Sequence, residues 1–350
     1  MRQRVWSKVM KASVGTIGLA GLIAFGGSMT ASSLSSSSTP TVAGSTPAVG
    51  YHLAGADGGV FNFGASGFYG STYTDGLTGL SGSHRLNAPI VGIAEMPTGK
   101  GYWLVAADGG VFNFGSAAFY GSSYTIGLTG LSGSHPLASP VVGIAPTPDG
   151  KGYWLVTKAG HVYGFGDASF YGDTHTDGLT GLSGSHPLSA PIVGIQSTPD
   201  GKGYWLVAAD GGVFNFGDAG FYGNTYTDGL TGLSGSHPLN APIVGIQSTP
   251  DGNGYWMVGA DGGVFNFGNA GFYGSTYSLG LTGLSGSHPL VSAVVGIVPT
   301  ANGQGYWLAT KAGFVYDFDS ADFLGDTSSL RITGLRGPTP LAAPIVRITD

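Results

Sequence analysis

Polar side chains suited to chemistry recur along this chain within a repeated Ser-Gly-Ser-His segment. Its histidines are His84, His135, His186, His237 and His288. A ring of imidazoles brought together by the fold would bind a metal ion or an anion. The alternative is that each histidine stabilises a turn within its own segment. In a sixth copy of the segment, Thr339 takes the place of the histidine.

Aspartates precede three of these histidines by nine residues, at Asp75, Asp177 and Asp228. Serine, histidine and aspartate are the residue types of a hydrolase triad. An enzyme needs one site rather than several equivalent ones, however, and Ile126 and Leu279 replace the aspartate in two copies. We therefore assign no catalytic residue. The five histidines and three aspartates remain candidates for ligand binding.

A group of carboxylates near the C-terminal end offers a different kind of site. It comprises Asp317, Asp319 and Asp322, with Asp326 close by. Carboxylate oxygens are ligands that Ca²⁺ prefers, although the spacing is not that of an EF-hand loop. The alternative is a solvated edge. We expect no other cofactor, and the absence of cysteine excludes disulfides, thiolate metal sites and cysteine nucleophiles.

Aromatic residues recur with the same regularity as the histidines. Tryptophan follows tyrosine at Trp103, Trp154, Trp205, Trp256 and Trp307, and His52 takes this place in the first copy. Phe-Tyr pairs follow at 68–69, 119–120, 170–171, 221–222 and 272–273. Aromatic rings with asparagine nearby suit sugar binding, but their position in predicted strands favours packing between neighbouring sheets.

These residues belong to a repeat of 51 residues, marked by Tyr51, Tyr102, Tyr153, Tyr204, Tyr255 and Tyr306. Each copy contains four strand candidates, for example 191–199, 204–209, 213–217 and a short fourth at 219–223. An Asp-Gly-Gly turn joins the second and third, because glycine tolerates the positive φ of tight hairpins. The strands are apolar on both faces and must be covered on both.

A closed ring explains how the repeat array begins and ends. The array opens at the second strand of a unit (51) and closes after a first strand (344–348). In a ring, the last strand pairs with the first hairpin and removes the exposed sheet edges. We therefore predict an all-β fold, a six-bladed β-propeller over residues 51–350 that is closed by the C-terminal strand. The alternative is an open β-solenoid.

Two segments carry a resemblance to known propellers. Residues 146–156 (PTPDGKGYWLV) resemble YVTN-type surface propellers, and 107–115 (ADGGVFNFG) resembles the repeats of quinoprotein-like propellers. The whole unit is similar to a repeat of secreted bacterial proteins of actinobacterial type. This resemblance, over residues 51–350, implies a propeller that binds ligands outside the cell. A quinone cofactor is not supported, because the chain has no cysteine and one glutamate, Glu95.

The N-terminal segment predicts export from the cytoplasm. Arg2, Arg4, Lys8 and Lys11 precede a weakly apolar stretch and small residues, so residues 1–31 are predicted as a signal peptide. The alternative is a single membrane anchor. Residues 32–50 form a Ser/Thr/Pro-rich linker. Without residues 1–31 the net charge is −10, because that segment holds four of the 13 cations and none of the 19 anions. Nucleic acid and anionic lipid are therefore not expected as partners.

Together these features predict a secreted or cell-surface module for multivalent binding or adhesion. Near-identical repeats create near-identical sites, and repetition raises avidity. A glycan or cell-wall polymer is the ligand class we expect. Two alternatives remain: a glycan-active hydrolase or lyase with one site at the channel mouth, and a structural surface protein. Enzymatic activity is not expected from the single glutamate and the repeated aspartates.

Overall fold

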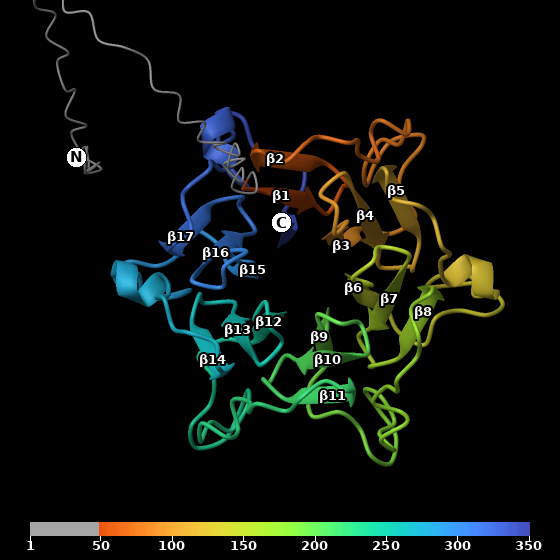
Figure 1. Ribbon diagram of the computed structural model, residues 1–350. Helices are drawn as coiled ribbons and strands as arrows, with labels where there is room; N and C mark the ends of the chain where they lie inside the picture. Colours follow the sequence, from red (N-terminus) through yellow and green to blue (C-terminus); the bar gives the residue numbers. More distant parts are fainter. Residues whose placement is uncertain (1–48) are drawn as a thin grey trace, which may run out of the picture. The chain divides into compact units, whose positions relative to one another are not determined.

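The computed structural model describes residues 49–350, which form six three-stranded antiparallel sheets arranged as blades around a central axis (Figure 1). From the inner to the outer strand, the blades are β18 (Ile345–Thr349), β1 (Gly50–Gly55) and β2 (Val60–Gly64) in blade 1; β3 (Ile90–Glu95), β4 (Gly101–Ala106) and β5 (Val111–Gly115) in blade 2; β6 (Val141–Pro146), β7 (Gly152–Thr157) and β8 (Val162–Gly166) in blade 3; β9 (Ile192–Ser197), β10 (Gly203–Ala208) and β11 (Val213–Gly217) in blade 4; β12 (Ile243–Ser248), β13 (Gly254–Gly259) and β14 (Val264–Gly268) in blade 5; and β15 (Val294–Pro299), β16 (Gly305–Thr310) and β17 (Val315–Asp319) in blade 6. The predicted six-bladed propeller is confirmed.

The expected fourth strand of each blade is absent from the described residues. In blade 4 the segment 219–223 is irregular, and side chains satisfy its carbonyl groups. Trp205 Nε1 donates to the carbonyl of Gly220 at 2.6 Å, and Asn215 Nδ2 donates to that of Ala219 at 2.9 Å. The segment therefore caps its own sheet and does not add a strand to it.

The Asp-Gly-Gly turn forms the predicted hairpin between middle and outer strands. In blade 4, Asp210 Oδ1 accepts a hydrogen bond from the Gly212 amide at 3.0 Å. Gly211 has φ +86°, and a Cβ there would collide with Thr225. Glycine is required at this position for both reasons.

The hydrophobic core is divided among the interfaces between neighbouring blades. Between blades 4 and 5, for example, Trp205 and Val207 pack against Tyr255 and Met257. The tyrosine that opens each middle strand is fully buried and reaches back to the preceding blade; Tyr204 Oη donates to the carbonyl of Gly172 at 2.5 Å. Each blade is thus stabilised on both faces by its neighbours, as the apolar strands predict.

The ring is closed by the C-terminal strand. β18 pairs antiparallel with β1, with Ile348 opposite Leu53, and the chain ends near the centre of the ring (Figure 1). The Ala56 amide donates to the carbonyl of Pro344, and the Ala56 carbonyl accepts from the Ile90 amide of blade 2, both at 2.9 Å. Because these bonds continue the pattern of the other blades, the open solenoid is wrong.

Three short 3₁₀ helices lie in the segments between blades: Ser123–Ile126, Thr276–Leu279 and Thr327–Leu330. No helix within residues 49–350 is long and apolar enough to cross a membrane. The predicted signal peptide, 1–31, lies outside the described residues. So does the predicted linker, 32–50, up to residue 48; its last residue, Gly50, already belongs to β1.

Candidate ligand-binding site

The Ser-Gly-Ser-His segments lie in the connections between the outer strand of one blade and the inner strand of the next. Figure 1 shows these connections at the outer corners of the ring, away from its axis. All five histidines, from His84 to His288, are exposed. The structure therefore does not bring them together at the channel mouth.

Backbone atoms of these histidines close a turn within their own segment. The carbonyl of His135 accepts from the Thr129 amide at 2.8 Å, and the His135 amide donates to Thr129 Oγ1 at 3.2 Å. The imidazole contacts only the neighbouring Ser134, with Nδ1 at 3.1 Å from its Oγ. This arrangement matches the structural alternative for the histidines, in which each one supports its own turn.

The aspartate candidates are likewise dispersed on the surface. Asp75, Asp177 and Asp228 are exposed, and so are Asp317, Asp319 and Asp322. Of these, Asp319 has φ 55° and occupies the position that glycine holds at the end of the other outer strands. No group of metal-ligating atoms within 4.8 Å of one another in residues 49–350 includes any of the six.

A pocket of a different composition recurs between blades, near the Asp-Gly-Gly turns, and we call it the rim pocket. One wall is the connection that leaves the preceding blade, and the other is the hairpin of the next blade. Rim pockets of about 230, 310 and 340 Å³ lie at blades 2, 4 and 5. The blade 4 pocket is lined by Leu179, Pro187, Leu188, Ser189, Asp210, Phe214 and Tyr226, among others.

A tyrosine-aspartate pair forms the polar part of each rim pocket. In blade 4, Tyr226 Oη donates to Asp210 Oδ2 at 2.9 Å, while Gly212 holds the other oxygen of the carboxylate. Asp210 is buried, whereas Tyr226 is 42% exposed. Burial, followed by the hydrogen bond to the Asp210 carboxylate, raises the pKa of Tyr226 to about 12. The phenol therefore stays protonated and is held in place at neutral pH.

The pair recurs in four blades and is missing as a unit in two. It consists of Asp57 with Tyr73, Asp108 with Tyr124, Asp210 with Tyr226, and Asp261 with Tyr277. In blades 3 and 6 alanine replaces the aspartate, at Ala159 and Ala312, and His175 and Ser328 replace the tyrosine. Aspartate and tyrosine are therefore present or absent together.

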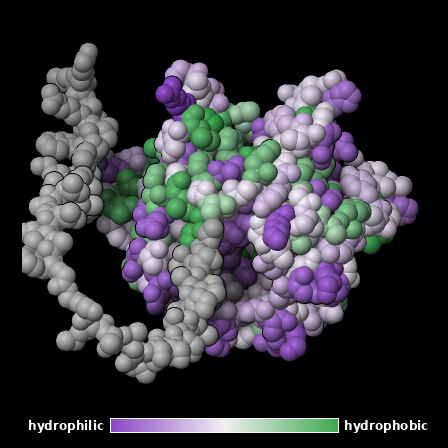
Figure 2. Space-filling model, turned by 45° about the horizontal axis from the view of Figure 1, so that its top comes forward, coloured by the Kyte–Doolittle hydropathy of each residue, from purple (hydrophilic) through white to green (hydrophobic). Residues whose placement is uncertain are grey.

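Exposed aromatic rings lie on the same rim. Phe221 is 50% exposed and Phe272, which lines the blade 5 pocket, is 56% exposed. The expectation that the Phe-Tyr pairs pack between blades is thus correct for the tyrosines, such as Tyr222, and wrong for the phenylalanines. Their side chains lie on an irregular segment and not on a fourth strand. Figure 2 shows apolar surface patches between hydrophilic residues.

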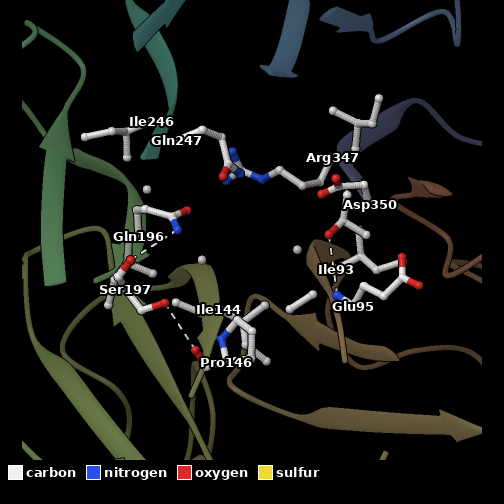
Figure 3. A pocket seen from close by; sticks show the side chains of 18 residues that line it. Ile93, Glu95, Ile144, Pro146, Gln196, Ser197, Ile246, Gln247, Arg347 and Asp350 are labelled. Atoms are coloured by element: carbon white, nitrogen blue, oxygen red, sulfur yellow. Dashed lines mark hydrogen bonds between the residues drawn. The ribbon is translucent and has the colours of Figure 1, made fainter. Parts of the chain in front are cut away.

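The axial channel differs from the rim because it breaks the repeat. Five inner strands place glycine at the position that Arg347 occupies in β18. The guanidinium crosses the channel and donates to the carbonyls of Val244, Val142 and Val193 at 3.1, 3.2 and 3.3 Å (Figure 3). Its burial lowers the pKa of Arg347. One arginine therefore fills the channel and joins three other blades.

Carboxylates lie at the end of the channel next to Arg347. Glu95 Oε2 is 3.1 Å from Nδ1 of the buried His52, whose Nε2 is 2.9 Å from the carbonyl of Gly67. Enclosure by the channel, followed by the charge of Glu95, raises the pKa of Asp350 to about 7. These groups line a cavity of about 180 Å³ together with Gln196 and Gln247 (Figure 3).

Replacing Arg347 tests its role in holding the ring. We expect Arg347→Ala to lower the free energy of unfolding by about 1–3 kcal/mol. Hydrogen bonds to charged groups contribute about 1.5–3 kcal/mol each, and the cost of burying the charge offsets part of this. Arg347→Met, which fills space without donating, should be destabilised similarly in urea unfolding followed by tryptophan fluorescence. Wild-type stability in both variants would contradict this role.

Sequence reasoning did not identify the rim-pocket pairs or the channel residues. Both leave a signal in the aligned repeats. Asp210 and Tyr226 are revealed by their joint replacement in blades 3 and 6, and Arg347 by its position where the other copies have glycine. Reading each copy for departures at single positions, and not only for what recurs, would have found them.

Comparisons with known proteins give a similarity of fold only. No protein-family model and no curated protein matches the chain. Among solved structures, the chain is similar to the β-propeller domain of Cps50 (Swd1) from Myceliophteria thermophila, with 10% identity and a TM-score of 0.38. The match covers 69% of this chain and 68% of that one. The assignment as a propeller rests on the six sheets themselves.

Proposed function

We propose that the protein is a secreted or cell-surface module that binds a glycan or cell-wall polymer through its rim pockets. The observation that carries this proposal is the recurrence of one pocket, with the same tyrosine-aspartate pair, around the ring. Its resemblance to secreted bacterial repeat proteins and its N-terminal segment favour the same setting.

The composition of the rim pocket suits a sugar unit. An aromatic face is supplied by Phe214 or its counterparts, and hydrogen-bonding groups by Asp210, Tyr226 and, in blades 2 and 5, Asn87 and Asn240. Sugars present both C–H faces and hydroxyl groups, so they match an apolar wall with a few fixed polar atoms. The volumes of 230–340 Å³ lie near the lower end of ligand pockets, about 300–1,000 Å³.

Repetition explains how such small pockets would hold a polymer. Each pocket buries little ligand, so we expect weak binding per site. Linked sites raise the overall affinity by about 10²–10⁴-fold when a polymer can engage several at once. A long glycan with repeating units fits this arrangement better than a single small molecule does.

The test is a binding screen of the purified protein against soluble glycans and insoluble cell-wall polymers. We expect three or four equivalent weak sites per chain in calorimetry with a short oligosaccharide. Asp210→Ala with Tyr226→Ala should remove one site and leave the affinity of the others unchanged. Removing the pairs of blades 2, 4 and 5 together should reduce retention on the polymer more than threefold, because avidity is lost.

The chain supplies matched controls for these variants. Alanine at the aspartate position occurs naturally in blades 3 and 6, so Asp210→Ala should fold. His237→Ala and Asp228→Ala alter exposed residues outside the pockets and should bind like the wild type. If those two variants lose binding and the pocket variants keep it, the rim-pocket proposal is wrong and the Ser-Gly-Ser-His segments are the site. Absence of all binding would leave a structural surface protein as the function.

A glycan-active enzyme remains the second candidate, and the channel mouth is where it would act. Glu95 and Asp350 there are two carboxylates with different surroundings, which is what glycosidases use. The cavity of about 180 Å³ is smaller than the usual ligand pocket and Arg347 crosses it. Release of reducing ends from a bound glycan, abolished by Glu95→Gln, would favour this candidate over binding alone.

A further inference from the structure

Blade 3 replaces the tyrosine-aspartate pair with a cluster of metal-ligating side chains. His161 stands where blades 1, 2, 4 and 5 have glycine, and His175 stands where they have tyrosine. Asp173 occupies the equivalent of Ser122. The three changes occur in one copy and meet at one point, beyond the hairpin of β7 and β8. Ala159 leaves this point free of the carboxylate found in the other four blades.

The three side chains are close enough to share one ion. One ligand atom from each of His161, Asp173 and His175 lies within 4.8 Å of the other two, and no other such group exists among residues 49–350. His161 Nδ1 is 3.4 Å from Asp173 Oδ2. Elsewhere around the ring the exposed histidines stand alone. The cluster is therefore a unique feature of a repetitive molecule.

The backbone holds the Asp173 carboxylate in place before any ligand arrives. Its Oδ1 accepts from the amides of His175 and Thr176, both at 3.0 Å. Its Oδ2 is left to face the imidazoles. Although burial opposes ionisation, the hydrogen bond from His161 and those from the backbone keep the pKa of Asp173 below its usual value. An ionised, oriented carboxylate is thus present at neutral pH.

The two imidazoles are arranged as neutral ligands. Their rings stack with centroids 3.5 Å apart and an angle of 9° between planes. Two imidazolium ions would repel each other at this distance. Burial, followed by the nearby His161, lowers the pKa of His175. Nδ1 of His175 is buried and has no hydrogen-bond partner. Such an atom costs free energy unless a ligand satisfies it.

We propose that His161, Asp173 and His175 bind one divalent transition-metal ion of the Zn²⁺ class in blade 3. Two imidazole nitrogens and one carboxylate oxygen are ligands that Zn²⁺ accepts, whereas Ca²⁺ prefers oxygen alone. Three protein ligands leave a fourth position for water or for a ligand group. Because the rings are parallel, they tilt apart on binding. The His161 side chain, 30% exposed, has room for this movement.

The experiment is equilibrium dialysis of the full chain against Zn²⁺ at neutral pH, followed by metal analysis. No glycan is present, so the result does not depend on the function proposed above. We expect one ion per chain bound saturably and a rise in the thermal unfolding temperature. Co²⁺ in place of Zn²⁺ should produce visible absorption of a four-coordinate site, which a purely structural histidine stack would not.

Two variants convert the cluster to the residues of the other blades: His161→Gly and His175→Tyr. Loss of even an outer partner of a metal ligand weakens binding by about 10–100-fold, so each variant should bind at least about tenfold more weakly. Circular dichroism should show that both fold, since glycine and tyrosine occupy these positions in four blades. His135→Ala and His186→Ala should bind like the wild type. Absence of one-site binding, or full binding by both cluster variants, would overturn the proposal.

Discussion

Deletion of residues 345–350 should abolish the native ring. These residues form β18, which supplies the inner strand of blade 1, and Ile345 and Ile348 are buried in the last interface. Truncating a buried isoleucine costs about 2–5 kcal/mol. The deletion also exposes the edge of β1 and removes Arg347 from the channel. The sum approaches the whole stability of a domain, about 5–15 kcal/mol.

Size-exclusion chromatography and limited proteolysis measure this loss. We expect the deleted chain to aggregate or to be cleaved throughout residues 49–344, because opening one interface removes the closure that orders the rest. A chain that stays monomeric, resistant to protease and cooperative in unfolding would show that closure by β18 is dispensable.

A circular permutant serves as the matched control. In blade 4, residues 198–202 (TPDGK) connect the inner strand to the middle strand. The same five residues inserted between Asp350 and Gly50 should form the missing turn of blade 1, with the chain reopened within 148–151 in blade 3. We expect this permutant to fold like the wild type. Closure then depends on the presence of all 18 strands and not on where the chain begins.

Trp205→Ala should lower the free energy of unfolding by about 3–5 kcal/mol, as large-to-small changes at buried tryptophan do. Trp205 is fully buried between blades 4 and 5, and its Nε1 holds the carbonyl of Gly220. The substitution leaves both a cavity and an unsatisfied carbonyl. Urea unfolding monitored by circular dichroism measures the change, because it does not rely on the tryptophan that is lost.

Blade 1 shows what can replace this tryptophan. His52 stands at the equivalent position, bonds to the carbonyl of Gly67 as tryptophan bonds to its own blade, and contacts Glu95. The equivalent of Glu95 for blade 4 is Ser248. Trp205→His with Ser248→Glu should therefore be more stable than Trp205→His alone. If the second change does not help, the His52–Glu95 pair is not what compensates for the missing tryptophan.

Most of the fold was predictable because the chain repeats. The spacing of Tyr51, Tyr102 and their counterparts defines the blades, and the Asp-Gly-Gly turns define their hairpins, since both follow from local chemistry. The phase of the repeat at its two ends predicted the pairing of β18 with β1. The fourth strand was predicted wrongly because apolar residues at 219–223 resemble a strand. Only the tertiary structure shows side chains of Trp205 and Asn215 bonding to that segment's carbonyls.

The candidate sites depended far more on the tertiary structure. The sequence alone determined which residue types recur, so it directed attention to the exposed histidines and aspartates of the connections. It did not determine which side chains meet. Asp210 and Tyr226 are 16 residues apart, and Arg347 is more than 100 residues from each of its three carbonyl partners. Such contacts arise when the ring closes, because only closure brings residues from separate blades to one point.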